Sequence, residues 1–393
     1  EIITTKIDSN VYGQQVLDTL YKEDELPVKI DIASKLTGKT VGGFSYGLLS
    51  ASTSPNNKKY IISRFKQDLL SGNSFLGFMH TSTNESQHIS LDGMLNIFDN
   101  RINLESQIIK SRKNKKGLYS NLSFILTDKI NGWLEYSQYD SAFNINDIGY
   151  LYRDDYSIKE CGLYLNPLKY YSFINDLFFT IKIDEEKNSN GLDLGKTLEL
   201  NQELKFSNQW VLSGGLYKIY KHYDDRKIIY FFETDSTGLF GPPIYIPEVS
   251  GYYYTISSDK HRKTSFSFSV TRAENTRDDK EKSEYIEFIY KPNSFLILNL
   301  SYDRYRLMKK YKWIESFFEP EREIDGIMIG DNKIHHIFSS INRKIDIITF
   351  RITGNISRSI SLQGYMEMYF NNDFYDKNSY TEYDQYTQKY LGN

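Results

Sequence analysis

Hydrophobic and polar residues alternate with a period of two along most of this chain. Between Ile348 and Ser357 the even positions hold Ile, Phe, Ile, Gly and Ile, and the odd positions hold Thr, Arg, Thr, Asn and Ser. Successive side chains of a β-strand point to opposite faces, so this segment predicts a strand with one apolar and one polar face. The same pattern returns at 89–97, 118–127, 296–303 and 361–370. Almost no segment shows the 3.6-residue period of an amphipathic helix, and the pattern indicates an all-β protein.

Turn-forming residues separate the predicted strands. Tight connections are predicted at Asp99-Asn100, Ser71-Gly72-Asn73, Asp128-Lys129, Asn208-Gln209 and Pro292-Asn293. Longer polar connections are predicted at 139–154, 184–193, 221–248, 274–283 and 304–332. Tight connections are predicted after both residue 342 and residue 356. Short turns and longer loops alternate in an outer-membrane barrel, so two successive tight connections indicate an unrecognised strand within 304–332 or 221–248.

The predicted strands are long. We count about 18 of them, between roughly 16 and 20, and many reach about ten residues, whereas strands of globular proteins average about 5–6. A strand that crosses a bilayer at a tilt needs about 9–11 residues, has one apolar face, and is flanked by aromatic residues. Aromatic residues gather near strand ends at Tyr170-Tyr171, Phe178-Phe179, Tyr252-Tyr253-Tyr254 and Tyr369-Phe370. We therefore predict an antiparallel transmembrane β-barrel of the outer-membrane type.

A soluble all-β protein, such as a β-propeller or a large sandwich, is the alternative fold. Three features argue against it: the strand length, the scarcity of continuously apolar strands that could fill a dry core, and the absence of a repeat with a fixed blade length. No apolar stretch reaches the roughly 18 residues of a membrane-spanning helix.

The composition suits strands that are apolar on one face only. The chain has 33 Tyr, 24 Phe and 3 Trp, yet all hydrophobic residues together make up 39%. Its 48 basic and 51 acidic residues give a net charge of -3, so there is no electrostatic reason to expect nucleic acid as a partner. A single cysteine, Cys161, allows no internal disulfide and no Cys-rich zinc site.

Several short motifs in the first fifth of the chain look familiar. ASKLTGKT at 33–40, GFSYGLL at 43–49 and AST at 51–53, with further likeness at 63–69, 73–78 and 361–365, resemble a bacterial outer-membrane β-barrel domain of unknown function. In that family the domain typically follows a carbohydrate-binding module similar to family nine. The residues that carry the resemblance are Lys35, Gly38, Gly43, Gly47, Arg64, Asp68 and Gly77.

The resemblance implies an outer-membrane barrel of undescribed role. We expect a lead-in segment at 1–27, the barrel domain at 28–371 and a polar C-terminal tail at 372–393. No carbohydrate-binding module precedes Glu1, and the tail ends without the closing strands of the family, so we expect either a fragment or a shortened gene. Gly38 suits a tight turn, whereas Gly43 and Gly47 fall within predicted strands, where glycine permits a bend or a close approach.

The polar faces of the predicted strands would line the interior of a barrel. That interior is expected to carry charges of both signs. These side chains can select solutes, or they can only form hydrogen bonds and salt bridges with one another across neighbouring strands. The candidate lumen-facing residues are Asp92, Asn96, Glu105, Gln107, Asn299, Asp303, Thr349, Arg351, Asn355, Gln363 and Glu367.

No catalytic constellation stands out, and we predict neither an enzyme nor a cofactor. His335 and His336 would point to opposite faces of a strand, so they cannot bind one metal ion together. The acidic runs near Asp184 and Asp278 lack the spaced oxygen ligands of a calcium loop, and a solvated loop explains them. Neither a nucleophile elbow nor a phosphate-binding glycine loop is present.

We predict a protein of the bacterial outer membrane, in contact with its lipid, that serves as a solute passage or as the membrane anchor of a surface assembly. A structural subunit of an envelope complex with a plugged lumen is an alternative, in which long loops bind other envelope proteins or surface glycans. A soluble all-β carbohydrate-active protein is the further alternative. It would need a pair of catalytic carboxylates that the sequence does not reveal.

Overall fold

The computed structural model describes residues 6–11, 14–18, 29–54, 57–167, 172–231, 238–324, 327–331, 333–357, 360–375, 379–384 and 389–390. These residues form β-strands and their connections, with one 3-10 turn at Leu70–Gly72. The chain is divided into two compact units. Unit 1 comprises Glu1–Leu163, Ile183–Gly195 and Phe231–Leu239, and unit 2 comprises Tyr164–Lys182, Lys196–Tyr230 and Phe240–Asn393.

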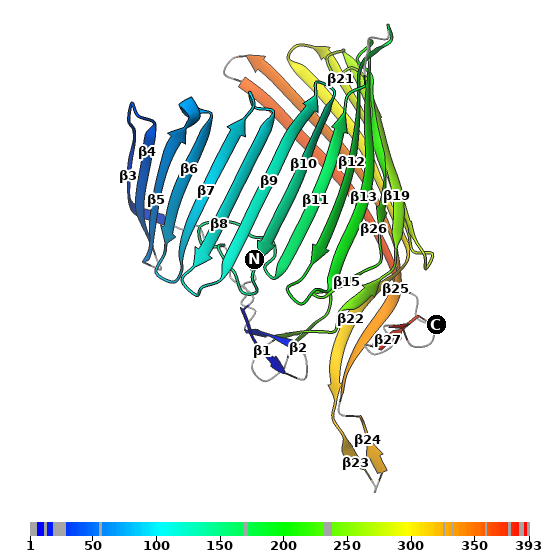
Figure 1. The fold of residues 1–393 in the computed structure, drawn as a ribbon. Coiled ribbons are helices and arrows are strands. Elements are labelled where there is room, and N and C mark those ends of the chain that lie inside the picture. Colours follow the sequence, from blue (N-terminus) through cyan, green and yellow to red (C-terminus); the bar gives the residue numbers. More distant parts are fainter. Residues whose placement is uncertain are drawn as a thin grey trace. The chain divides into compact units, whose positions relative to one another are not determined.

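Eighteen strands of nine residues or more follow one another along the described chain (Figure 1). The first nine are β3 (Lys29–Lys39), β4 (Phe44–Ser54), β5 (Lys58–Leu69), β6 (Ser74–Ser82), β7 (Gln87–Ile97), β8 (Ile102–Ser111), β9 (Lys116–Thr127), β10 (Ile130–Tyr139) and β11 (Tyr156–Leu165). The other nine are β12 (Ile174–Lys187), β13 (Asp193–Phe206), β14 (Val211–Ile219), β19 (Val249–Ser257), β20 (Thr264–Asn275), β21 (Lys280–Asn293), β22 (Leu296–Glu319), β25 (Lys333–Ser357) and β26 (Ile360–Tyr375).

Each long strand of unit 1 from β3 to β10 pairs antiparallel with the next one along the chain. In unit 2 the same holds from β13 to β14 and onward through β19, β20, β21, β22, β25 and β26. The predicted fold class, an all-β antiparallel fold of the outer-membrane barrel type with about 18 strands, is confirmed. No helix among the described residues is long and apolar enough to cross a membrane.

Short strands occupy the longer connections and the ends of the chain. They are β1 (Lys6–Val11) with β2 (Gln14–Asp18), β15 (His222–Asp224) with β18 (Ile244–Ile246), β16 (Ile229–Phe231), β17 (Gly238–Phe240), β23 (Arg322–Ile324) with β24 (Ile327–Ile329), and β27 (Thr381–Asp384) with β28 (Lys389–Tyr390). The predicted lead-in thus contains β1 and β2. The predicted tail contains the end of β26, β27 and β28.

Strand register gathers leucines on one face of unit 1. Leu95, Leu104, Leu122 and Leu134 are directly opposite one another across β7, β8, β9 and β10. Three of the four are exposed, at 41% for Leu95, 36% for Leu104 and 49% for Leu134. A contiguous apolar row of this kind on a water-facing surface would be unusual in a soluble protein.

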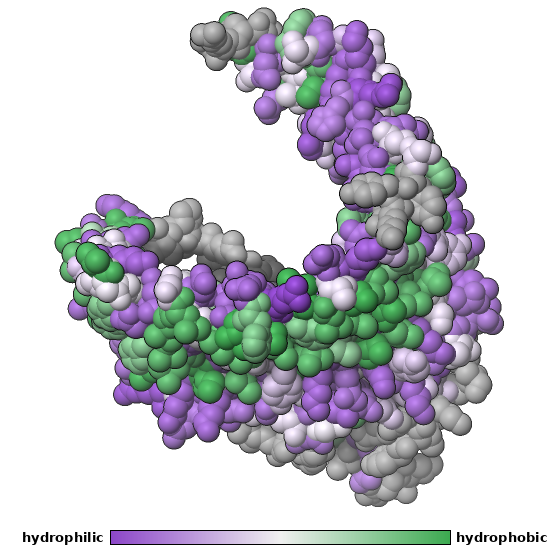
Figure 2. Space-filling view, turned by 45° about the horizontal axis from the view of Figure 1, so that its top comes forward, coloured by the Kyte–Doolittle hydropathy of each residue, from purple (hydrophilic) through white to green (hydrophobic). Residues whose placement is uncertain are grey.

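Burial in the described chain is inverted relative to a soluble protein. Only seven hydrophobic side chains are buried, whereas 47 large hydrophobic side chains are exposed. Figure 2 shows a green band of hydrophobic residues between purple hydrophilic ones on the surface of the protein. Strand alternation therefore directs apolar side chains outward and polar ones to the opposite face, as the period-two pattern predicts.

Several tight connections fall where the sequence places them. Ser71, Asp99, Asn100 and Gln209 have positive φ angles of 57°, 54°, 65° and 67°, the left-handed conformation that such turns require. The connection expected at Pro292-Asn293 is shifted, because β21 continues to Asn293. These residues separate the strands as predicted, with an error of about two residues at the last one.

Three predicted long connections are wrong in their extent, because strands occupy half or more of each. β12 continues to Lys187, β20 and β21 leave only 276–279 between them, and β22 continues to Glu319. No break follows residue 342, since β25 runs without interruption from Lys333 to Ser357. The charged residues that suggested loops pair with one another at the strand ends, as Lys280 does with Glu274 at 2.9 Å.

We predict that the apolar and polar faces of one strand tolerate charge very differently. Leu104→Arg places a cation on the apolar face of β8 and should destabilise the protein in lipid by about 2–4 kcal/mol. The matched control Glu105→Arg places the same side chain on the opposite face of the same strand and should have little effect. Urea titration after refolding into lipid vesicles measures both changes. Equal losses for the two variants would contradict the assignment of faces.

Candidate functional site

Polar side chains on the face opposite the exposed leucines pair across the strands of unit 1. The guanidinium of Arg64 on β5 donates to both carboxylate oxygens of Asp92 on β7. Strand β6 lies between these two strands, so the Arg64 side chain crosses an entire strand to reach its partner. The bidentate geometry is the strongest form of side-chain ion pair.

Gly77 on β6 makes this crossing possible. A Cβ atom at position 77 would lie 2.6 Å from one terminal guanidinium nitrogen of Arg64 and 2.7 Å from the other. Any side chain there would displace the arginine. The resemblance residues Arg64 and Gly77 therefore act together, with Asp92 as the third member.

Asp68 is the centre of a second group of resemblance residues. Its carboxylate accepts from Lys39 Nζ at 2.6 Å and from Lys66 Nζ at 3.1 Å, and its backbone N–H donates to the carbonyl of Gly43 at 3.0 Å. Gly43 has a φ of +80°, and a Cβ there would lie 2.9 Å from the Cβ of Asp68. This group fixes the end of β5 against the turn that joins β3 to β4.

The predicted roles of two glycines are wrong. Gly38 lies within β3, not in a turn, and the Tyr46 side chain fills the space beside it, 2.5 Å from the position that a Cβ would take. Gly43 lies in the turn, not in a strand, and its positive φ is the conformation that only glycine adopts easily. Lys35 on β3 and Gly47 on β4 lie in strands, opposite Leu49 and Thr37.

The structure places the eleven predicted lumen-facing residues on the polar face of their strands. In unit 1, Asn96 donates to the carbonyl of Asn73 at 2.7 Å and accepts from Asn103 at 2.5 Å. Glu105 and Gln107 on β8 are opposite Asn121 and Tyr119 on β9. That this face lines a lumen stays a prediction.

The other seven predicted lumen-facing residues belong to unit 2 and lie on β22, β25 and β26. Asn299 donates to Glu287 at 2.8 Å, and one oxygen of Asp303 is buried without a hydrogen-bond partner. The Arg351 guanidinium lies 5.4 Å from the centre of the Tyr365 ring. Cross-strand register pairs the remaining residues, with Thr349 opposite Glu367, Asn355 opposite Ser361, and Gln363 opposite Thr353.

Sequence reasoning missed several members of the polar face. Trp133 Nε1 donates to Glu160 at 2.7 Å, and Tyr253 donates to Asn201 at 2.8 Å. The aromatic runs suggested a lipid-interface belt, so the alternation within them, which sends Tyr253 to the polar face and Tyr252 to the apolar face, was overlooked. Of the other predicted belt residues, Tyr170 and Tyr171 lie outside the described residues.

A small apolar cluster lies where β22 and β25 extend beyond their apolar rows. Ile228, Ile244, Phe338 and Tyr383 are each no more than 2% exposed. They come from the connection between β14 and β19, from β25 and from β27, and Tyr311, Trp313 and Tyr390 pack against them. We call these residues the cap cluster. It is the part of the described chain that resembles the interior of a soluble protein.

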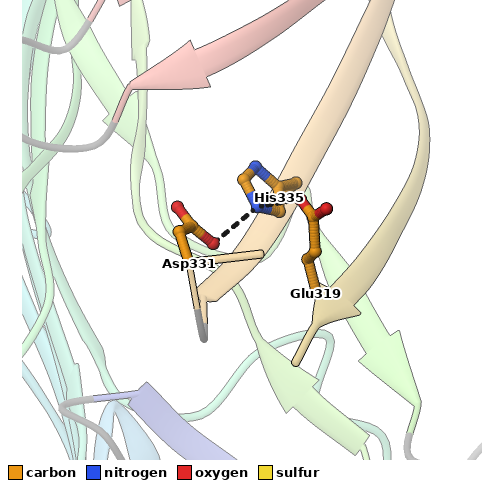
Figure 3. Close-up of side chains that lie close together, drawn as sticks. All are labelled: Glu319, Asp331 and His335. Atoms are coloured by element: carbon orange, nitrogen blue, oxygen red, sulfur yellow. Dashed lines mark hydrogen bonds and ion pairs between the residues drawn. The ribbon is translucent and has the colours of Figure 1, made fainter. Parts of the chain in front are cut away.

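His335 lies among three carboxylates, two of which, Asp331 and Glu319, are drawn with it in Figure 3. Its Nε2 atom is 3.0 Å from Asp331 and 3.4 Å from Glu319, and its Nδ1 atom is 2.7 Å from Glu382. Burial alone lowers the pKa of His335, but the hydrogen bonds with Glu382 and Asp331 outweigh burial and raise the pKa above its usual value.

The same donor set has the chemistry of a divalent cation site. Ligand atoms of Glu319, Asp331 and His335 lie within 4.8 Å of one another, and Glu382 would orient the imidazole through its second nitrogen. His336 takes no part, because its Nδ1 atom bonds with Ser316 Oγ at 2.7 Å. Burial lowers the pKa of His336 to about 4. No spacing rule could reveal this group, since its members come from separate segments.

Comparison with known proteins places the chain in a family. A family model described as a domain of unknown function (DUF5916) matches residues 77–390. The chain belongs to this family. The match covers most of the described strands, including the hairpin that carries His335. No curated protein sequence matches the chain.

Three solved structures are similar to this one. The chain matches OpdL of Pseudomonas aeruginosa with a TM-score of 0.37 and 10% identity, covering 87% of this chain and 91% of that one. It matches BamA of Haemophilus ducreyi lacking POTRA domains 1–3 with a TM-score of 0.33, 12% identity, and 86% and 76% coverage. It matches an anion-selective porin of Comamonas acidovorans with a TM-score of 0.33, 9% identity, and 86% and 100% coverage.

We predict that Arg64 and Asp92 are energetically coupled. Arg64→Gln and Asp92→Asn should each destabilise the protein, and the double variant should lose less than the sum, with a coupling energy of about 1–3 kcal/mol. Denaturant titration of the refolded protein in detergent measures the cycle. Arg64→Gln combined with Glu105→Gln is the control and should be additive within about 0.5 kcal/mol. Additivity of the Arg64–Asp92 cycle would contradict the coupling.

We predict that the β22–β25 extension loosens as pH rises. The pKa of folded His335 is raised, so its stabilising contribution is complete below the unfolded value of 6.5 and is lost as pH rises through the folded pKa. Hydrogen exchange of residues 333–341 and 379–384 should therefore accelerate as pH rises above 6.5 and through the raised folded pKa of His335, after correction for intrinsic rates. His335→Gln should abolish the pH dependence. The lowered pKa of His336 acts only below 6.5, outside this window.

Proposed function

We propose that this protein is an outer-membrane β-barrel of a bacterial cell and that its polar face lines a passage for solutes. One observation supports the membrane location above all others, the inverted burial of 47 exposed against seven buried hydrophobic side chains in the described chain. The family itself has no described role, so the proposal depends on the geometry of this chain.

The cost of keeping this apolar face in water supports the same location. Transferring a Leu, Ile or Phe side chain out of water is worth about 1.5–3 kcal/mol. Contiguous apolar rows on unit 1 and unit 2 would favour aggregation in water, whereas in a bilayer these side chains would contact the hydrocarbon chains of the lipid. Strands of nine residues or more also suit a bilayer crossing.

The polar face supports a passage for polar solutes. Its ion pairs, such as Arg64 with Asp92 and Lys182 with Glu199, place both signs of charge on the same face. Glu105 has no ion pair among the described residues, so its charge is available to solutes. A surface of this kind is hydrated and can discriminate ions by charge.

A second candidate function is the membrane anchor of a surface assembly. The cap cluster favours it, because a packed apolar cluster outside the membrane-spanning rows gives the chain a folded part that another envelope protein could contact. The expected association with a carbohydrate-binding module belongs to this candidate and stays a prediction.

We predict that the full chain, produced with an export signal, is found in the outer-membrane fraction and migrates differently on gels when heated. In planar bilayers it should form channels, and Glu105→Arg should shift the reversal potential toward anions, because it adds a cation to the polar face. Glu105→Gln controls for loss of the native charge.

A monodisperse, soluble protein in detergent-free buffer would contradict the membrane location. Inserted, heat-modifiable protein without conductance would contradict the passage and favour the anchor. A conducting protein whose reversal potential is unchanged by Glu105→Arg would contradict the assignment of this residue to the passage.

A further inference from the structure

Four neighbouring strands of unit 2 each have a basic residue at the same register position, so that the four residues lie side by side across the sheet. Arg272 on β20 is opposite Lys282 on β21, Lys282 is opposite Arg306 on β22, and Arg306 is opposite Lys344 on β25. We call these four residues the cationic row. Like charges directly opposite one another destabilise a sheet, so such a row requires negative charge nearby.

The cationic row lies on the apolar face of the sheet. Two rows along the same face, Phe268 is opposite Ile286, which is opposite Tyr302, which is opposite Ile348. One row further, Phe266, Phe288, Leu300 and Phe350 are opposite one another, and three of these four are exposed. The cationic row thus lies two rows from the first apolar row, toward the end of the strands that is nearer the cap cluster.

The protein supplies too little negative charge for this group. Between the cationic row and the apolar rows lie Glu284, Arg304 and Asp346, again opposite one another. Glu284 pairs with Arg272. Asp346 accepts from Tyr302 at 2.6 Å, from Arg304 at 3.3 Å and from Arg306 at 2.8 Å, so both of its oxygens already have donors.

The two lysines of the cationic row, Lys282 and Lys344, are the basic residues of this patch without a carboxylate partner among the described residues. Neither Lys282 nor Lys344 forms an ion pair among the described residues, whereas all three arginines do. Five cations therefore face two carboxylates on this patch. The arginines are held in place by their partners, and the lysine ammonium groups are available to an external anion.

A depression of about 510 Å³ lies at the β19 end of the row. Tyr252, Arg272 and Lys282 line it, together with Glu274 and Glu248. Both of these acids already have a lysine partner, at 2.9 Å for Lys280 and 2.8 Å for Lys218. Glu281 and Lys280 also line it, so three acids face three basic residues, and the depression adds space beside the row but no net positive charge.

We propose that the cationic row binds the phosphate group of an anionic lipid at the bilayer boundary, an inference that rests on the proposed insertion into a membrane. A lipid fits better than a free anion because apolar rows follow on the same face, beyond the row of Glu284, Arg304 and Asp346, and there Phe268 and Ile286 can contact an acyl chain. The two lysine ammonium groups bind phosphate as point charges, and the arginines, paired with their carboxylates, add to the positive charge of the patch. Juxtamembrane basic clusters attract anionic headgroups in the same way.

The experiment uses the full chain in neutral detergent and counts bound lipid by native mass spectrometry. Dioleoylphosphatidylglycerol should bind about tenfold more tightly than dioleoylphosphatidylcholine, and the preference should fall at high salt. Lys282→Gln/Lys344→Gln should abolish the preference. The matched control, Lys260→Gln/Lys263→Gln, removes two lysines from the connection at the opposite end of β19 and β20 and should keep it.

Equal binding of the two lipids, or a preference that survives Lys282→Gln/Lys344→Gln, would overturn the inference. Inorganic phosphate is added as a competitor, and displacement of the phosphatidylglycerol at equal concentration would mean that the site takes free phosphate and not a lipid. Insertion of each variant is measured by heat-modifiable migration in phosphatidylcholine vesicles. Wild-type protein that does not insert refutes the proposed function, whereas inserted protein without lipid preference refutes only the lipid site.

Discussion

Hydrogen bonding between neighbouring backbones holds this protein together, because its sheets have almost no buried apolar interior. In a soluble domain the burial of apolar side chains supplies most of the stabilising free energy, and strand pairing follows from it. Here only seven hydrophobic side chains are buried in the described chain. In the bilayer that we propose, an unpaired backbone group is costly, and the antiparallel ladders of the long strands would supply the stabilisation that a buried core supplies elsewhere.

That constraint explains which features the sequence could predict. Period-two alternation follows directly from a sheet with one apolar and one polar face, and it correctly predicts the strands, the fold class and the faces of residues such as Leu104 and Glu105. Turns marked by Asp99-Asn100 or Asn208-Gln209 were also recognisable. Charged segments at strand ends were misread as loops, because polarity says nothing about cross-strand partners such as Lys280 and Glu274.

The interactions between distant segments could not be predicted. The contact of Arg64 with Asp92 depends on the absence of a side chain at Gly77, and the carboxylates around His335 come from the end of β22, the connection before β25, and β27. The cationic row depends on the register of four strands, which a single sequence does not specify. Alternation alone placed the eleven candidate residues on one face, but their partners come from tertiary structure.

The Arg64 side chain that lies across β6 has a further consequence for how the sheet assembles. A shift of β6 by one residue would bring Leu76 or Phe78 beneath the guanidinium in place of Gly77 and would turn the apolar face of that strand inward. The ion pair between β5 and β7 can form only when the strand between them is correctly aligned. The Arg64–Asp92 ion pair therefore favours the native register of all three strands. Gly77 distinguishes that register from the two that are shifted by one residue.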